Sequence, residues 1–196
     1  MTPQLVRRDV LLHNPGSAGI PDEQLHFPFL FESDHGAWYL TYREGPHLER
    51  QFGPGNRVQC VQSLDHGKNW IPWMGLTPEP WLYQFFPSRV DASTLLFCRT
   101  GLSDTRMNTD GTMNADAVVF RSADGGAIWR REICSLTRLP FLAGEHLITL
   151  WGPVISHPAG GLLWGIMSRE NRSISGVVQS MDHGHSWTYL LSLIHI

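Results

Sequence analysis

The sequence contains few cysteines and no long hydrophobic run. Only three of its 196 residues are cysteines, Cys60, Cys98 and Cys134, an odd number that favours reduced, buried thiols over a disulfide framework. No apolar stretch is long enough to cross a bilayer. The first residues also lack the apolar segment of a secretory signal. These absences predict a cytoplasmic protein without a membrane span; if the natural N-terminus lies further upstream, secretion stays open.

The chain also lacks a strong charge bias and the common motifs of metal and cofactor sites. Lysine and arginine number 15 against 18 acidic residues, giving a net charge of −3, so nothing favours binding to nucleic acid. There is no C-x-x-C, no H-E-x-x-H and no glycine-rich phosphate loop. We therefore expect no metal and no cofactor. Helical periodicity is absent as well, and 19 glycines with 13 prolines suit many short strands joined by turns.

One eight-residue pattern, S-x-D-x-G-x-x-W, occurs three times. It reads SLDHGKNW at 63–70, SADGGAIW at 122–129 and SMDHGHSW at 180–187. The serines are 59 and 58 residues apart, and so constant a period indicates a repeat architecture.

Each copy lies between two strand-like runs, which predicts a hairpin loop. The aspartate is expected to accept backbone N–H groups, the glycine to supply a positive φ, and the tryptophan to pack between neighbouring sheets. We predict structural and not catalytic roles for Ser63, Asp65, Gly67, Trp70, Ser122, Asp124, Gly126, Trp129, Ser180, Asp182, Gly184 and Trp187.

The pattern resembles the Asp box of sialidases and related BNR-repeat proteins, which are six-bladed β-propellers. The resemblance extends over nearly the whole chain and implies an all-β fold. About three four-stranded blades of an expected six are present, near residues 25–76, 77–138 and 139–194, with a ring-closing strand at 5–13. Residues 191–196 match the translation of a sequencing adapter. They are expected to be a non-native tail on a truncated reading frame.

Strand reversal separates the two ends of such a blade. The boxes follow the third strand, so the loops after the second strand lie at the opposite end. One of these is expected to be a long loop over 100–114. In the sialidases that the sequence resembles, the opposite end holds the active site.

An arginine stands at the end of each expected second strand: Arg43, Arg99 and Arg169. Guanidinium groups suit bidentate recognition of a carboxylate, and the resemblance implies an arginine cluster that holds sialic acid. With Glu170, these arginines are the predicted substrate-binding residues. Alternatively, they pair with neighbouring acids and tie the blades together.

The segment REGPH at 43–47 is similar to segments of bacterial sialidase-like proteins. Its Glu44 and His47 are the predicted catalytic residues, as general acid or base, although both could instead bind hydroxyl groups. Other polar residues expected at this end are Asp104, Arg106, Asp110 and Glu145.

The sequence departs from the sialidase pattern in three ways. His26 stands where the family has the arginine of its F/Y-R-I-P segment, and the 44–56 loop contains no aspartate. The tyrosine nucleophile of that family comes from later blades. The prediction is therefore a fragment of a sialidase-like exo-glycosidase that acts on or binds glycans. The alternative is a non-catalytic propeller that binds a glycan or a protein partner.

Overall fold

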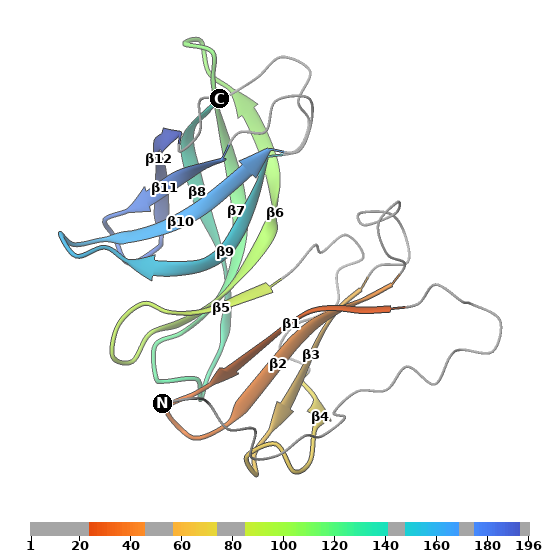
Figure 1. Ribbon diagram of the computed structural model, residues 1–196. Helices are drawn as coiled ribbons and strands as arrows, with labels where there is room; N and C mark the ends of the chain where they lie inside the picture. The colour runs from red at the N-terminus through yellow and green to blue at the C-terminus, as the bar shows by residue number, and fades with distance from the viewer. Residues whose placement is uncertain (1–23, 46–56, 74–84, 141–147, 169–174, 193–196) are drawn as a thin grey trace, which may run out of the picture.

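The computed structural model of the chain describes residues 24–45, 57–73, 85–140, 148–168 and 175–192. These residues form twelve strands and no helix (Figure 1). The all-β prediction is confirmed. The described part of the chain accordingly has no helix that could serve as a membrane span.

The strands form three consecutive antiparallel units of four, called blades 1 to 3 below. Blade 1 consists of β1 (Gln24–Glu32), β2 (Trp38–Gly45), β3 (Arg57–Ser63) and β4 (Ile71–Pro72). Blade 2 consists of β5 (Phe85–Arg89), β6 (Leu95–Met107), β7 (Thr112–Ser122) and β8 (Arg130–Pro140). Blade 3 consists of β9 (Ile148–Ser156), β10 (Leu162–Ser168), β11 (Ser175–Ser180) and β12 (Ser186–Ser192).

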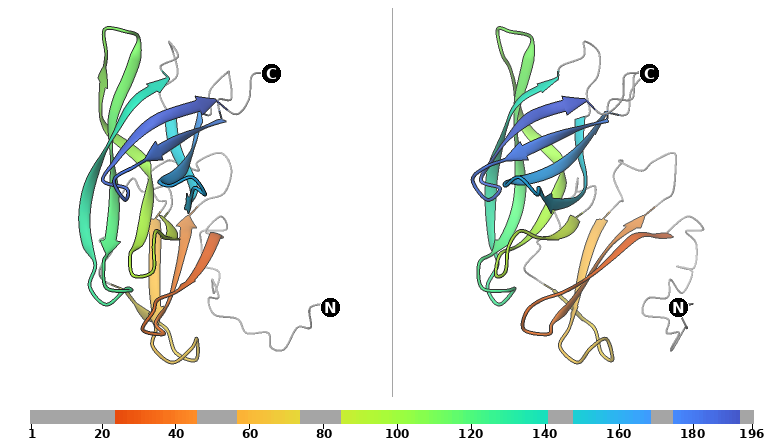
Figure 2. Two further views of the ribbon diagram at one scale, coloured as in Figure 1. Left: turned by 90° about the vertical axis from the view of Figure 1, so that its left-hand side faces the viewer. Right: turned by 60° about the vertical axis from the view of Figure 1, so that its left-hand side comes forward.

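Blade 1 is a separate sheet, whereas blades 2 and 3 share one. Their outer strands β8 and β12 run parallel and pair over three residues, 135–137 with 186–188, giving the strand order β5-β6-β7-β8-β12-β11-β10-β9. The shared sheet folds back on itself, so that β9 also packs on β5 and β6 (Figure 2).

Blade 2 packs against both other blades. Side chains alternate along its strands, so each of its two faces can meet a different blade. Phe97, Val118 and Phe120 join an aromatic cluster with blade 1. Leu96 and Val119, one residue away in each strand, belong to the larger core shared with blade 3. Both faces of this sheet are therefore buried.

The prediction of a long loop over 100–114 is wrong. The β6 and β7 strands continue through most of it and meet in a tight turn at 108–111, with two irregularities in register along the way. The strand β8 extends to Pro140, past the expected end of blade 2 at 138. Of the expected tail, Leu191 and Ser192 form the end of β12. The expected strand at 5–13 lies outside the described residues.

Candidate functional site

The three Asp boxes have the same hydrogen-bonded structure. Each lies between the third and fourth strands of its blade, as predicted. In every box the serine hydroxyl donates to the aspartate Oδ1 at 2.6–2.8 Å and accepts the N–H of the box glycine at 2.8 Å. The tryptophan indole N–H donates to the carbonyl of that glycine at 3.0–3.2 Å. The box is thus a closed local unit.

The box aspartates are occupied by their own loops. Each Oδ1 accepts the N–H of the residue before the tryptophan, at 2.8–3.0 Å. Hydrogen bonds from the backbone and side chain of Asn69 lower the pKa of Asp65 to about 2. Burial opposes ionisation of Asp182, but hydrogen bonds led by those from Ser186 lower its pKa to about 2. Such groups stay ionised at neutral pH and cannot serve as proton donors there.

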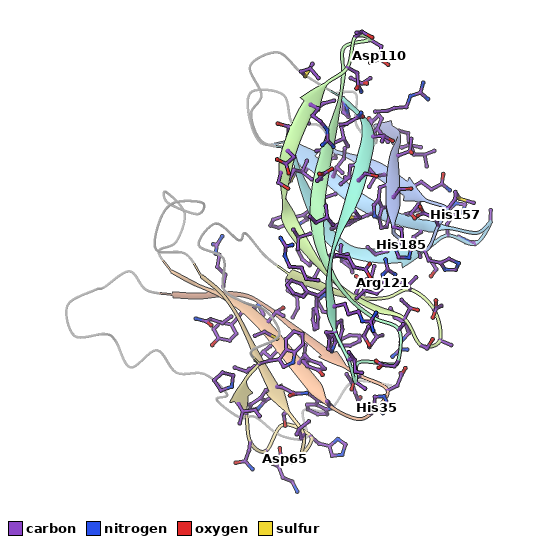
Figure 3. All side chains as sticks on the ribbon, turned by 180° about the vertical axis from the view of Figure 1, so that it is seen from behind. His35, Asp65, Asp110, Arg121, His157 and His185 are labelled. Carbon is purple, nitrogen blue, oxygen red and sulfur yellow. The ribbon has the colours of Figure 1, made fainter. Side chains whose placement is uncertain are left out.

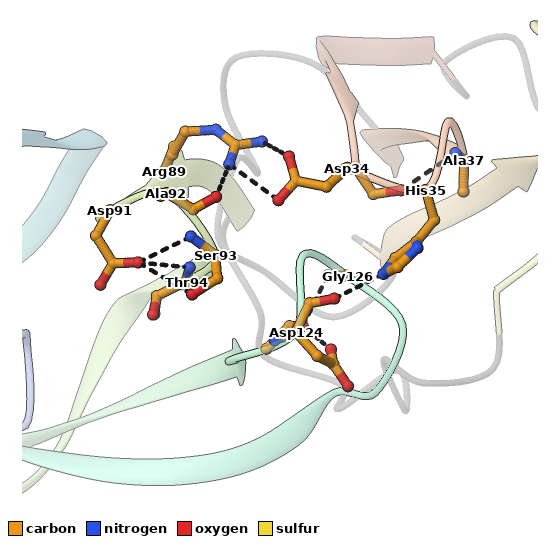
Figure 4. A network of polar contacts seen from close by, with 12 residues as sticks. Asp34, His35, Ala37, Arg89, Asp91, Ala92, Ser93, Thr94, Asp124 and Gly126 are labelled. Atoms are coloured by element: carbon orange, nitrogen blue, oxygen red, sulfur yellow. Dashed lines mark hydrogen bonds and ion pairs between the residues drawn. The ribbon is translucent and has the colours of Figure 1, made fainter.

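The box turns also join neighbouring blades. The turn after β1 contacts the second box (Figure 4). In it, the Asp34 N–H donates to the Gly125 carbonyl at 2.9 Å, and His35 Nε2 lies 2.7 Å from the Asp124 carbonyl. The Asp34 carboxylate accepts two bonds from Arg89, at 2.6 and 3.2 Å. Blade 1 is therefore tied to blade 2 at the box end.

A second connection at the box end involves Arg121, a residue that was not predicted from the sequence. This side chain is 8% exposed; its Nη1 donates to the His183 carbonyl in the third box at 2.9 Å, and its Nε to Glu132 at 2.7 Å. The signal available was a charged residue directly before a box serine, at the end of an apolar strand. Tyr39 has the same function one blade earlier, because its hydroxyl donates to the Gly126 carbonyl at 3.1 Å.

The opposite end holds the predicted arginines, as far as the structure describes them. Arg43 lies near the end of β2, 2% exposed and paired in register with His26 and Val58. Arg99 lies in β6 opposite Phe85. Arg169 follows the last residue of β10 and is outside the described residues.

All three second strands run away from the box turns, but the two described arginines, Arg43 and Arg99, stand at different distances along theirs. The reference is the residue that pairs with the box serine, which is Trp38 in blade 1, Leu95 in blade 2 and Leu162 in blade 3. Arg43 and Arg99 therefore lie toward the same end of their strands, while the place of Arg169 and the convergence of the three guanidinium groups stay predictions.

The predicted catalytic residues also stay predictions. Glu44 follows Arg43 in β2 and pairs in register with Leu25 and Arg57, but its side chain is not among those described. His47, Glu170 and Glu145 lie outside the described residues.

The β6–β7 hairpin uses its polar groups internally. Arg106 pairs with Asp116 at 2.8 Å, and Asp110 accepts the Thr112 N–H at 2.9 Å. Figure 3 shows Asp110 at the end of the molecule away from Asp65. Asp110 thus has the plain turn role that its Asp-Gly sequence predicts.

The described residues contain no group of three or more histidine, cysteine, aspartate or glutamate side chains that could hold a metal ion. The three cysteines are free and buried, and burial raises the pKa of Cys134 to about 12. Burial shifts the pKa values of Cys60 and Cys98 in the same direction. Nucleophilic thiol chemistry therefore has no support at these positions.

Comparison with known proteins identifies the fold. No protein-family model matches the sequence, and no curated protein matches it. A Dyadobacter fermentans protein of unknown function is similar in structure, with a TM-score of 0.53, 20% identity, and coverage of 89% of this chain and 56% of that one. The Hadza microbial sialidase Hz136 has a TM-score of 0.53 and 17% identity, and the match covers 90% of this chain and 39% of that one. The Penicillium chrysogenum alpha-L-arabinanase complexed with arabinobiose has a TM-score of 0.50 and 15% identity, and the match covers 93% of this chain and 52% of that one.

These similarities establish an all-β fold of the β-propeller type. The chain spans 39 to 56% of the length of the three similar chains.

Proposed function

We propose that this chain is part of a β-propeller that acts on or binds glycans through the end opposite the Asp boxes. The observation that carries the proposal is that polar side chains at the box end are occupied by structural contacts. At the box end, the carboxylates and the buried arginine described above are engaged in holding loops and joining blades. The polar residues that we assign to a ligand come from the ends of the second strands.

In this proposal Arg43, Arg99 and Arg169 bind an acidic or hydroxyl-rich sugar, together with Glu170. A guanidinium group can donate two parallel hydrogen bonds to a carboxylate, and such bonds strengthen away from bulk water. The burial of Arg43 provides such surroundings. Two structurally similar propellers are a sialidase and an arabinanase bound to arabinobiose, which fits a carbohydrate ligand.

Glu44 and His47 would supply the general acid and base of an exo-glycosidase. Glu44 is the next residue of β2 and His47 comes two residues after its end, so both belong to the strand end that carries Arg43. General acid–base catalysis needs such groups within hydrogen-bond reach of the glycosidic oxygen.

A second candidate is a propeller that binds glycans without cleaving them. The observation that favours it is the pairing of His26, in place of the family's arginine, with Arg43 in the register of β1 and β2. A histidine there removes one fixed cation from the expected cluster.

Binding and hydrolysis can be measured separately. The purified chain is titrated with N-acetylneuraminic acid and with arabinobiose by calorimetry, and 4-methylumbelliferyl glycosides report turnover. We expect Arg99→Ala to abolish sugar binding, whereas Asp124→Ala lowers stability and leaves binding intact at a temperature where it is folded. Equal binding by wild type and Arg99→Ala would refute the site. Turnover by the chain would exclude the second candidate.

A further inference from the structure

The faces that blades 1 and 2 turn toward each other are apolar near the boxes. The side chains that pack together there are Tyr39 and Cys60 of blade 1 with Phe97, Val118 and Phe120 of blade 2. All of them lie within four residues of a box serine or of the residue that pairs with it. The strand register therefore gives a common scale for positions further from the boxes on both blades.

On blade 1 this face becomes polar away from the boxes. Side chains alternate along β2, so Thr41 and Arg43 lie on the same face as Tyr39. Thr41 is 0% exposed and Arg43 is 2% exposed. Arg43 is five residues beyond Trp38, the residue that pairs with the box serine. Arg43 thus stands just beyond the apolar cluster, on the side of blade 1 that meets blade 2.

On blade 2 the β6–β7 hairpin makes the same change. Asp116 continues the alternation of Val118 along β7 and lies six residues before the box serine. Directly paired residues of two antiparallel strands share a face. The polar side chains of this face are Ser103, Arg106, Asn114 and Asp116. The hairpin that carries them projects beyond the neighbouring strands (Figures 1 and 2).

The other face of the hairpin belongs to a different contact. Leu102 and Met113, each next in its strand to a residue of the polar face, pack with the core that blade 2 shares with blade 3. The polar face is therefore turned away from blade 3. It continues the face of blade 2 that meets blade 1.

An irregularity in β6 lies where the face changes from apolar to polar. Residues 99–101 of β6 stand opposite the single residue Val118 of β7. A bulge of this kind bends the strand and turns its side chains, and bulges are common next to active sites. Arg99 is the first residue in it. The bulge, Arg43 and Asp116 thus stand at neighbouring levels of blades 1 and 2.

Arg106 and Asp116 form an ion pair on the polar face. Nη2 of Arg106 lies 2.8 Å from Oδ1 of Asp116, and their side chains are 56% and 19% exposed. A carboxylate has about four acceptor sites, and a guanidinium group has several donors. One contact between the two groups therefore leaves both able to bind a ligand. Such a pair suits sugar hydroxyl groups, which can donate to the carboxylate and accept from the guanidinium group.

We propose that Arg106 and Asp116 are further ligand-binding residues, which hold hydroxyl groups of the glycan beside Arg43 and Arg99. The inference rests on the proposed function and extends its site from the strand ends to the β6–β7 hairpin. The charges also orient an acidic sugar. Its carboxylate turns toward Arg43 and Arg99, because Asp116 repels it, and its hydroxyl groups turn toward the hairpin.

Calorimetric titration of the full chain with N-acetylneuraminic acid and with arabinobiose tests this. Asp116→Asn keeps the shape of the side chain and removes its charge. It should weaken binding of either sugar that the wild type takes by roughly tenfold, because hydrogen bonds to a charged group are lost. The matched control Asp110→Asn, on the turn of the same hairpin, should bind as the wild type does. Urea unfolding of each variant checks that the fold is retained.

A second measurement separates ligand contact from a structural role. The three native cysteines are buried, so Ser103→Cys adds an exposed, reactive thiol on the cross-strand partner of Asp116. Saturating sugar should slow alkylation of this thiol by iodoacetamide several-fold. The same sugar should leave alkylation of the control Thr109→Cys, on the exposed turn, unchanged.

The outcomes distinguish this inference from the proposed function. A wild-type chain that binds neither sugar would overturn both. If the wild type binds and Arg99→Ala does not, wild-type affinity in Asp116→Asn would overturn the inference alone. Equal alkylation rates of Ser103→Cys with and without sugar would do the same.

Discussion

Replacing Asp182 by alanine tests the conclusion that the box aspartates hold the fold. The carboxylate accepts the Ser180 hydroxyl at 2.7 Å, the Ser186 N–H at 2.9 Å and the Ser186 hydroxyl at 2.6 Å. Its pKa falls from 3.8 to about 2, which corresponds to at most about 2.4 kcal/mol of folding free energy. Because the side chain is largely exposed, solvent screening reduces this contribution to about 1 kcal/mol.

The pH dependence gives this prediction its sign. A carboxyl group whose pKa is lower in the folded state stabilises the fold above its unfolded pKa, and the stabilisation is lost as the pH falls through the folded pKa. The destabilisation caused by Asp182→Ala should therefore be full at pH 7 and about half as large near pH 3.

Urea unfolding followed by tryptophan fluorescence measures the effect at both pH values. Glu32→Ala, which removes an exposed carboxylate at the end of β1, is the control and should leave the midpoint unchanged. A wild-type midpoint for Asp182→Ala at pH 7, or a difference that does not shrink near pH 3, would refute the reasoning.

Three further predictions concern packing. Trp187→Ala should lower the free energy of unfolding by about 3–5 kcal/mol, since it empties a buried site between blades 2 and 3; a loss below about 1 kcal/mol in urea unfolding would contradict this. Gly126→Ala should destabilise the chain more than Gly111→Ala. Both glycines have positive φ, but only at Gly126 would a new Cβ meet Ser33, at 2.6 Å, so equal urea midpoints would argue against a close blade contact. The three buried cysteines should react with Ellman's reagent only after unfolding, and rapid labelling of the native chain would contradict their burial.

The boxes were predictable because their structure is local. Serine, aspartate, glycine and tryptophan of one box bond to each other within eight residues, so the pattern alone specifies the turn. The strands before each box were equally visible, since β-branched and aromatic residues fill them. The partners of the boxes in other blades were not visible, because they are far apart in sequence.

The segment 100–114 shows where composition misleads. Its glycines and polar residues favour a loop, yet the chain forms a hairpin there. On the exposed side of the hairpin, Arg106 pairs with Asp116, and the side-chain amides of Asn108 and Asn114 bond reciprocally at 3.1 Å. The buried side alternates with it, since Met113, Ala115 and Ala117 lie in the core, and this period-2 pattern was the signal of a strand.

Of the candidate site, the structure describes Arg43 and Arg99 in the second strands of their blades, while the place of Arg169 stays a prediction. The irregular pairing of β6 with β7 beyond Cys98 was not predicted, because bulges leave no clear sequence signal. Arg121 was missed for a different reason. Its role depends on a carbonyl group in the next blade, which only packing brings within 2.9 Å.

The contacts of the box end explain why the box pattern repeats while its partners do not. The second and third boxes present backbone carbonyls to the blade before them, and a carbonyl accepts from any donor of suitable reach. Tyr39 uses a hydroxyl for this purpose and Arg121 uses a guanidinium group. The acceptor side of the joint is therefore fixed by the turn, whereas the donor side is free to vary. Because Arg121, Tyr39 and the box aspartates at this end hold loops and join blades, we seek ligand contacts at the ends of β2, β6 and β10.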